Sequence, residues 1–179
     1  MKYIIASDIH GSFFYTQKII EIMQNENADT LILLGDIYNH GPRNNLPSAY
    51  EPMNVANALN SIKDKLIVIK GNCDSQVDTM ISEFDFIEHI IIVSGNKRVF
   101  LTHGHVYNEN NLPKTKVDAL IYGHFHVGMI KRDNGITLAN PGSISLPKLQ
   151  SARSYLVLED DLLILKNIDG EIITQDKID

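Results

Sequence analysis

Side chains that commonly bind metal ions recur in short polar clusters along this sequence, and each cluster follows a run of apolar residues. In chain order the clusters are Asp8-Ile9-His10, Gly35-Asp36, Gly71-Asn72, His103-Gly104-His105 and Gly123-His124-Phe125-His126. Imidazole combined with carboxylate and amide oxygens suits Mn²⁺, Fe²⁺, Zn²⁺ or Ni²⁺, whereas an all-oxygen set would suit Mg²⁺ or Ca²⁺. The clusters therefore predict a site for one of the first four ions.

The number of candidate ligands indicates more than one ion. Seven ligands are too many for one tetrahedral site, but they match two ions that share a carboxylate. Two ions roughly 3.5–4 Å apart are the usual arrangement for hydrolysing phosphate esters. The clusters therefore point to hydrolysis at phosphorus.

The apolar runs before the first clusters have the character of buried strands. Tyr3–Ala6, Thr30–Leu34 and Leu66–Ile69 are short and apolar, and each ends close to a polar cluster. A helix is predicted to begin after Gly11-Ser12, with Ser12 as its cap, and another is predicted over Val55–Ile62. Strands that are hydrophobic on both faces and alternate with helices are typical of a parallel sheet. The carboxyl ends of such strands lie at one edge, so we expect the clusters to converge there.

The second half of the chain consists mostly of predicted strands. Asn96 and the segment Asp133-Asn134-Gly135 supply turn residues between some of them, and a helix is predicted over Asn111–Lys116. The predicted strands are Phe86–Val93, Arg98–Thr102, Ala119–Tyr122, Val127–Lys131, Ile136–Leu138, Tyr155–Leu158 and Leu162–Ile168. The sequence shows no repeat, low-complexity segment or linker. We therefore expect one α/β domain that spans residues 1–179.

Length, composition and charge are those of a globular protein with one core. The chain has 179 residues, of which 44% are hydrophobic and 21% charged, and its net charge is −6. It has no basic patch, so it is not expected to bind nucleic acid or an anionic membrane. Cys73 is the only cysteine, so no internal disulfide is expected. Asp8 follows Met1 too closely for a signal peptide, and apolar runs such as Leu31–Leu34 are too short to span a membrane. A cytoplasmic protein is therefore expected.

The ordered motifs resemble those of the calcineurin-like metallophosphoesterases. Five motifs in one order are a strong signal, although each alone would be weak. The matching motifs are Asp8-x-His10, Gly35-Asp36, Gly71-Asn72, His103 and Gly123-His124-x-His126. The resemblance extends from Asp8 to the segment Asn140-Pro141-Gly142-Ser143. The stretch from Gly35 to Asn44, together with Gly71-Asn72-Cys73-Asp74, is similar to the small prokaryotic phosphodiesterases of the YfcE type.

This resemblance implies a fold and a ligand set. The implied fold is a four-layer α/β/β/α sandwich, in which two mixed sheets pack together with helices on the outside. Two divalent ions are implied; Mn²⁺ is our prediction, with Ni²⁺, Fe²⁺ and Zn²⁺ as alternatives. A water or hydroxide between them would attack phosphorus in line, without a covalent enzyme intermediate. The first ion would be held by Asp8, His10, Asp36 and His126, and the second by the shared Asp36 with Asn72, His103 and His124.

Two positions depart from the family pattern. Cys73 stands where many members have a histidine that protonates the leaving group, and a neutral thiol is a poor acid at neutral pH. We therefore expect activity toward esters with good leaving groups, or another proton donor such as His40 or His105. Arg43 is expected to clamp a phosphate oxygen, which makes His40, Arg43, Cys73 and His105 the predicted catalytic residues. Phe125 replaces a common threonine and would either stack on a nucleobase or pack against its neighbours.

We therefore predict a metal-dependent hydrolase of phosphodiesters. A phosphomonoesterase is the alternative within this class. The alternative outside it is a non-catalytic scaffold, because the retromer scaffold subunit resembles this fold. All seven ligand positions hold standard ligand types, which favours the enzyme. The expected partner is a small-molecule phosphodiester rather than nucleic acid or a membrane, and a small homo-oligomer is compatible with this branch of the family.

Overall fold

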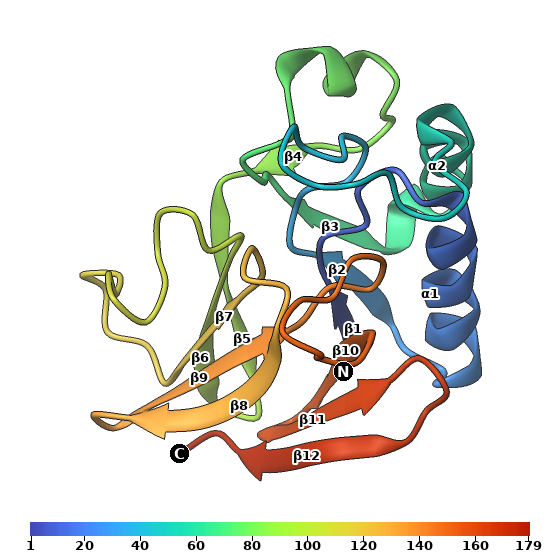
Figure 1. Cartoon of the computed structure of the whole chain (residues 1–179). Helices are drawn as coiled ribbons and strands as arrows, with labels where there is room; N and C mark the ends of the chain where they lie inside the picture. The colour runs from blue at the N-terminus through green and yellow to red at the C-terminus, as the bar shows by residue number, and fades with distance from the viewer.

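Two β-sheets pack face to face, and both α-helices lie against one of them (Figure 1). The computed structural model describes every residue from 1 to 179. None of its helices combines the length and apolar character that a membrane crossing requires. The elements are β1 (Lys2–Ala6), α1 (Phe13–Asn25), β2 (Thr30–Leu33), α2 (Pro52–Asn60), η1 (Lys63–Lys65), β3 (Leu66–Ile69), η2 (Gln76–Met80), β4 (Phe86–Ile87), β5 (His89–Ser94), β6 (Lys97–Thr102), β7 (Ala119–Tyr122), β8 (Gly128–Asp133), β9 (Ile136–Pro141), β10 (Ser154–Glu159), β11 (Leu162–Asn167) and β12 (Ile172–Lys177).

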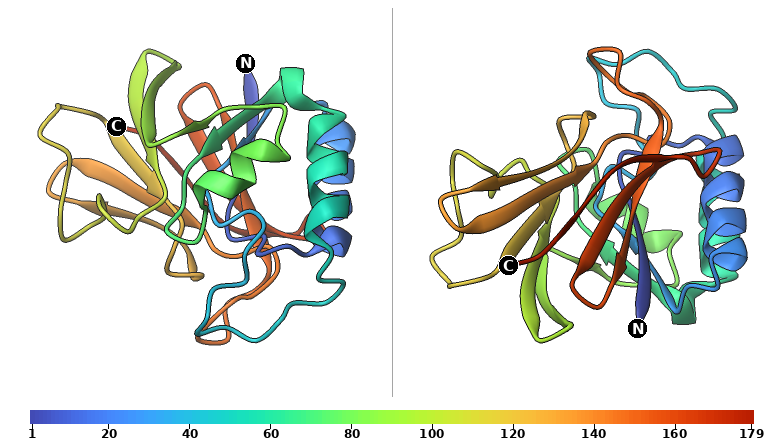
Figure 2. Two further views of the ribbon diagram at one scale, coloured as in Figure 1. Left: turned by 90° about the horizontal axis from the view of Figure 1, so that it is seen from above. Right: turned by 90° about the horizontal axis from the view of Figure 1, so that it is seen from below.

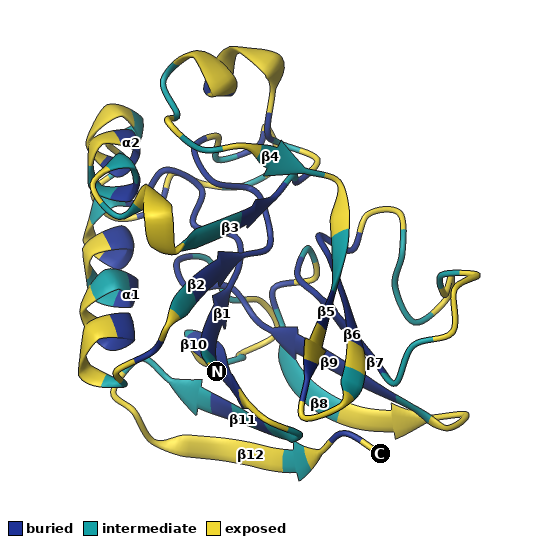
Figure 3. Cartoon of the chain, turned by 180° about the vertical axis from the view of Figure 1, so that it is seen from behind, coloured by how far each residue is buried: buried dark blue, intermediate teal, exposed yellow.

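The larger sheet has seven strands in the order β12-β11-β10-β1-β2-β3-β4. Strands β1 to β4 are parallel, as the alternation of apolar runs and helices predicts. Strands β10 to β12 extend the sheet in antiparallel pairs on the other side of β1. Strand β12 is largely exposed at the edge, whereas β1 and β2 are buried in the middle (Figure 3). The carboxyl ends of β1, β2 and β3 consequently lie at one edge.

The smaller sheet is also mixed, and it packs on the face of the larger sheet opposite the helices (Figure 2). Its strand order is β5-β6-β7-β9-β8, with β6, β7 and β9 parallel. Alternate side chains of a central strand pack in different layers of the core, because successive side chains point to opposite faces of the sheet. Ile4 packs toward the helices, whereas Ile5 packs between the sheets beside Leu101 and Ile121. This explains why β1 is apolar from Tyr3 to Ala6.

The predicted strand Phe86–Val93 is wrong as a single element. Phe86–Ile87 pairs with β3 in the larger sheet, whereas His89–Ser94 pairs with β6 in the smaller one. The chain therefore passes from one sheet to the other at Glu88. An almost unbroken apolar run is compatible with burial in either sheet, so its composition alone does not mark the crossing.

The predicted helix Asn111–Lys116 is also wrong, because this segment belongs to a loop between β6 and β7. Asn108 and Asn111 exchange two backbone hydrogen bonds of 3.1 Å, and the Asn111 side chain donates to the Val106 carbonyl. Such local bonds compete with helix formation, and Pro113 disfavours helical geometry at the preceding residue. The sandwich of two mixed sheets is confirmed. The predicted fourth layer is wrong, because both α-helices lie against the larger sheet and none lies over the smaller one.

Candidate metal centre

The structure brings the seven predicted ligands together where strands of both sheets end. Asp8 and His10 follow β1, and Asp36 follows β2. Asn72 follows β3 in the same sheet, whereas His103, His124 and His126 follow β6 and β7 of the smaller sheet. Backbone bonds hold the first two loops side by side, since Asp8 N–H donates to Gly35 O (3.1 Å) and His10 N–H donates to Asp36 O (2.8 Å).

Five of these seven residues have left-handed backbone conformations. Their φ angles are 59° at Asp8, 52° at His10, 55° at Asp36, 66° at His124 and 61° at His126. Left-handed backbone is uncommon for residues other than glycine and costs roughly 1–2 kcal/mol at each position. Strain that is concentrated at one cluster of side chains is typical of a functional site.

Hydrogen bonds to the backbone fix the protonation of three of the histidine rings. A carbonyl oxygen only accepts a hydrogen bond, so each Nδ1 that faces one must carry the proton. In the neutral ring Nε2 is then unprotonated, and its lone pair is available to a cation. The three contacts are His10 Nδ1 to Asn39 O (2.7 Å), His103 Nδ1 to Leu34 O (2.6 Å) and His126 Nδ1 to Leu146 O (2.6 Å).

One group of acceptor atoms forms around His10. Its Nε2 lies 3.3 Å from His126 Nε2 and 3.7 Å from Asp36 Oδ2. Asp8 Oδ1 lies 3.1 Å from His126 Nε2, and this oxygen is buried without a hydrogen-bond partner. Lone pairs that face one another in a buried site repel unless a cation lies between them. The donor set therefore fits a metal ion.

A second group forms around His103, and Asp36 belongs to both groups. His103 Nε2 lies 3.5 Å from Asp36 Oδ1, 3.0 Å from Asn72 Oδ1 and 3.3 Å from His124 Nδ1. The Asn72 amide is oriented by its Nδ2 group, which donates to Cys73 Sγ. Thus the two oxygens of one buried carboxylate face two separate sets of nitrogen and oxygen atoms.

The charges around these groups influence the protonation of the candidate ligands. Burial would raise the pKa of Asp8, but His10 and His126 hold it well below its usual value, so Asp8 is a carboxylate. Burial and the neighbouring His103 lower the pKa of His124, which keeps that ring neutral. Burial opposes protonation of His10, but the nearby Asp8 carboxylate outweighs it and raises the pKa of His10.

Asp74 is a supporting residue to which sequence reasoning assigned no role. Its buried carboxylate accepts hydrogen bonds from the backbone N–H groups of Asp36 (2.8 Å), Ile37 (2.8 Å) and Gly71 (2.7 Å). Burial raises the pKa of Asp74 to about 6, although these three bonds oppose the rise. Asp74 thereby joins the loop after β2 to the loop after β3. The sequence signal that could have identified Asp74 is its position directly after Gly71-Asn72-Cys73.

The segment after β9 supports Asp8 in the same way. The hydroxyl groups of Ser143 and Ser145 donate to the Asp8 carbonyl oxygen at 2.8 and 2.9 Å. Asn140 Nδ2 donates to the Gly123 carbonyl (2.8 Å), next to His124. The segment Asn140–Ser143 therefore positions ligand loops from both sheets.

Two glycines allow the loops to approach one another closely. A methyl group on Gly71 would overlap the carboxylate and the backbone nitrogen of Asp36, and one on Gly123 would overlap the Ser7 hydroxyl. The close approach, rather than an unusual backbone angle, requires glycine at position 71.

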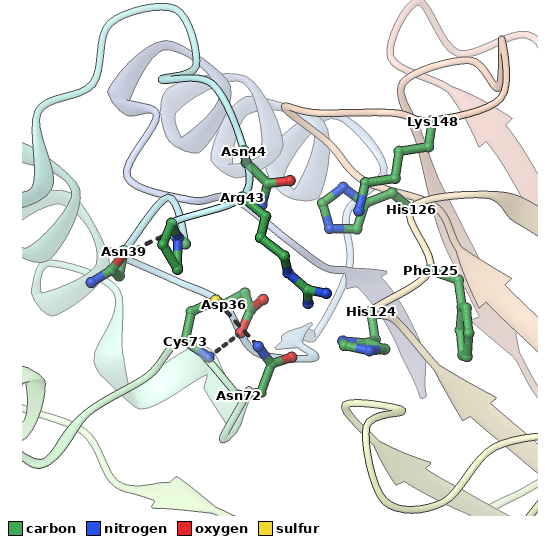
Figure 4. A pocket seen from close by; sticks show the side chains of 12 residues that line it. Asp36, Asn39, Arg43, Asn44, Asn72, Cys73, His124, Phe125, His126 and Lys148 are labelled. Carbon is green, nitrogen blue, oxygen red and sulfur yellow. Dashed lines mark hydrogen bonds between the residues drawn. The ribbon is translucent and has the colours of Figure 1, made fainter.

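A cleft of about 790 Å³ opens over the ligands (Figure 4). It is lined by Asp36, Asn39, Gly41, Pro42, Arg43, Asn44, Asn72, Cys73, His124, Phe125, His126 and Lys148. Two of the four predicted catalytic residues, Arg43 and Cys73, are among them. Burial and the nearby Asp36 carboxylate raise the pKa of Cys73 to about 12, so its thiol stays protonated at neutral pH.

The other two predicted catalytic residues lie outside the lining of the cleft. His40 packs edge-on against Tyr50, with ring centres 5.5 Å apart, and its Nδ1 is buried without a partner. His105 is exposed, and its ring centre lies 5.4 Å from that of His103. Burial and the neighbouring His103 lower the pKa of His105, so it is neutral at pH 7.

Residues 1–161 match the family model of the calcineurin-like phosphoesterase superfamily domain, and the chain therefore belongs to this superfamily. The predicted family and fold are thereby confirmed. Membership implies divalent metal ions, for which the candidate ligand groups described above are present.

Comparison with individual proteins places the chain within the superfamily. It is 41% identical over 180 residues to Phosphodiesterase YfcE of Escherichia coli K12, which covers 98% of this chain and 97% of that protein. A solved structure of the E. coli phosphoesterase YfcE superposes with a TM-score of 0.96 at 40% identity, covering 100% of both chains. Vacuolar protein sorting 29 of Cryptosporidium parvum gives a TM-score of 0.64 at 16% identity, covering 98% of this chain and 97% of that one; this likeness shows the fold alone.

Proposed function

We propose that this chain is a phosphodiesterase whose active centre holds two divalent metal ions bridged by Asp36. The observation that carries the proposal is the placement of the Asp36 carboxylate, with Oδ2 3.7 Å from His10 and Oδ1 3.5 Å from His103. Its two oxygens thus face two different sets of acceptor atoms. The similarity to a protein named Phosphodiesterase YfcE supports a diester as the substrate.

The donor set supports the following assignment of ligands. One ion would be held by Asp8, His10, Asp36 and His126, and the other by Asp36, Asn72, His103 and His124. Four imidazoles with carboxylate and amide oxygens suit Mn²⁺, which we propose, as well as Fe²⁺, Ni²⁺ and Zn²⁺. When bound, such ions supply a nucleophile from water at neutral pH and neutralise charge on the phosphate.

The residues of the cleft account for the rest of the reaction. Hydrolysis joins the oxygen of water to phosphorus and breaks the bond from phosphorus to the leaving alcohol, whose oxygen gains a proton. Arg43 lines the cleft and can donate two parallel hydrogen bonds to non-bridging oxygens. Cys73 keeps its proton, and neither His40 nor His105 lines the cleft. We therefore assign the proton on the leaving oxygen to solvent, which favours leaving groups of low pKa.

The substrate that we propose is a small phosphodiester. The cleft has the volume of a small-molecule site and lies over the ligands, and the chain carries a net charge of −6. This combination supports a small anionic ligand bound locally rather than a long nucleic acid. A cytoplasmic location remains a prediction.

Hydrolysis by metal-stripped and reloaded protein tests the proposal. The protein would be treated with a chelator, supplied with Mn²⁺ and assayed on bis-p-nitrophenyl phosphate and on p-nitrophenyl phosphate. We expect metal-dependent hydrolysis that is faster on the diester and is lost in Asp36→Asn and His124→Ala. Faster hydrolysis of the monoester would make the chain a phosphomonoesterase. Folded protein that is inactive with Mn²⁺, Ni²⁺, Fe²⁺ and Zn²⁺ would leave the scaffold as the interpretation.

A further inference from the structure

Lys148 is a cation in the cleft without an acidic partner. It lines the cleft with Arg43, and none of the ion pairs of the structure includes either residue. Most of the other lining side chains are neutral or are candidate metal ligands. Unpaired cations in a cleft attract an anionic ligand, most clearly in a chain whose net charge is −6. Lys148 was not among the predicted site residues.

The loop that carries Lys148 is fixed to a candidate metal ligand. Lys148 N–H donates to the His126 carbonyl (3.0 Å), and His126 Nδ1 donates to the Leu146 carbonyl (2.6 Å). A third bond joins Gly128 N–H to Ser151 Oγ (3.0 Å). The backbone of Lys148 is therefore held at a constant place relative to the metal centre, and its side chain extends from that place into the cleft (Figure 4).

Phe125 lines the same cleft and directly precedes His126, whose carbonyl accepts the backbone bond from Lys148. The ring contacts Tyr122 and His124 at near-perpendicular angles, with ring centres 5.9 and 5.3 Å apart. Phe125 nevertheless remains 43% exposed and lines the cleft. An aromatic ring held in this way is available to stack on a planar group of a ligand.

Arg43 approaches the cleft from a different loop. Residues 38–51 and 142–153 extend from the same side of the sandwich (Figure 2), and the first carries Arg43 while the second carries Lys148. A diester has one negative charge at the bond to be broken, and Arg43 is the cation assigned to it above. Lys148 is therefore a second cation in the cleft, which Phe125 also lines.

We propose that Phe125 and Lys148 form a binding site for one ester arm of the substrate, in which Phe125 stacks on a planar ring and Lys148 binds a second phosphate. The inference rests on the proposed phosphodiesterase function and specifies its substrate class. That class is nucleotide-like diesters that carry a phosphate in addition to the scissile one.

Binding and hydrolysis of two pairs of probes test this site. Calorimetry of the Mn²⁺-loaded protein would compare thymidine 3′,5′-bisphosphate with thymidine 5′-phosphate. Hydrolysis would compare thymidine 3′-phosphate 5′-(p-nitrophenyl phosphate) with thymidine 5′-(p-nitrophenyl phosphate). We expect the bisphosphate to bind about tenfold more tightly, as one additional charge-assisted contact allows. The substrate with the second phosphate should show a similar advantage in kcat/KM.

Four variants separate the two roles. Lys148→Met should remove the preference for the second phosphate, Lys148→Arg should retain it, and Lys116→Met, an exposed lysine outside the cleft, should change nothing. Phe125→Leu should weaken binding of both nucleotides. Equal effects of Lys148→Met on both members of each pair, or none, would overturn the proposal. If the wild type hydrolyses no diester but shows the Lys148-dependent preference in calorimetry, the phosphodiesterase function fails and this binding site stands.

Discussion

An added methyl group at Gly71 perturbs the bridging carboxylate without altering any ligand. Gly71 lies against Asp36, and a Cβ atom at this position would come within 3.0 Å of Asp36 Cγ and still closer to its Oδ1 and backbone nitrogen. The backbone of Gly71 is not left-handed, so alanine there carries no conformational penalty of its own. The Gly71→Ala variant therefore tests steric crowding of Asp36 alone.

The magnitude follows from the geometry of the two acceptor groups. Relieving the overlap requires Asp36 or the loop after β3 to move by about 1 Å, and such overpacking costs about 1–3 kcal/mol. For a domain of this size that loss lowers Tm by roughly 2–12 °C. Asp36 now lies 3.5 Å from His103 Nε2 and 3.7 Å from His10 Nε2, so the same movement displaces the shared ligand. A displacement of about 1 Å at a catalytic centre lowers the rate about 100-fold.

Three measurements on the variant check this reasoning: Tm, the bound metal per chain and kcat on bis-p-nitrophenyl phosphate. The matched control is Gly170→Ala, because Gly170 is in a turn with no atom near the added methyl group. Its φ of +89° makes alanine cost about 1–2 kcal/mol there, but activity and metal content should be unchanged. A Gly71→Ala protein with full metal content and activity within twofold of wild type would refute the reasoning.

Three further predictions concern stability and metal binding. Asp74→Asn should lower the free energy of unfolding by about 2–4 kcal/mol in urea titrations, because an amide cannot accept all three backbone bonds as a carboxylate does; a loss below 1 kcal/mol would contradict this. Burial alone would raise the pKa of Glu26, but the neighbouring Lys166 and Lys2 lower it. The stabilisation from Glu26 should therefore be complete at neutral pH and disappear as pH falls through that lowered pKa, so Glu26→Gln should cost about 1 kcal/mol only above it. Because the pKa of His10 is raised, Mn²⁺ affinity measured by calorimetry should decrease as pH falls toward 6, since the ring must lose its proton to bind; an affinity independent of pH would argue against His10 as a ligand.

Much of the fold could be predicted because the central strands are covered on both faces and are therefore apolar on both. The runs at Tyr3–Ala6 and Leu66–Ile69 are apolar on both faces, and both form strands of the larger sheet. The hairpin turn at Asn96 and the turn at Asn134-Gly135 both adopt positive φ angles, as their residue types indicate. The candidate ligands could be chosen because each polar cluster follows such a run closely.

The features that were not predicted depend on tertiary contacts, which a local sequence pattern does not indicate. Strand β12 is almost entirely exposed, so it lacks the alternation that identifies a half-buried strand. Ser12 stands at the helix start, but its hydroxyl donates to the Ser48 carbonyl rather than capping the helix. His40 and His105 were chosen for their chemistry, yet only tertiary packing decides which side chains line the cleft. Lys148 lies 22 residues after His126, and hydrogen bonds to His126 and Gly128 hold the loop that carries it.

The most direct test of the central claim is electron paramagnetic resonance of protein loaded with Mn²⁺, with the bound metal counted in the same sample. We expect two Mn²⁺ ions per chain and a spectrum of two exchange-coupled ions, because Asp36 would be a ligand of both. Asp36→Asn should abolish the coupled spectrum. One ion per chain, or two ions with the spectrum of isolated Mn²⁺, would contradict a centre bridged by Asp36.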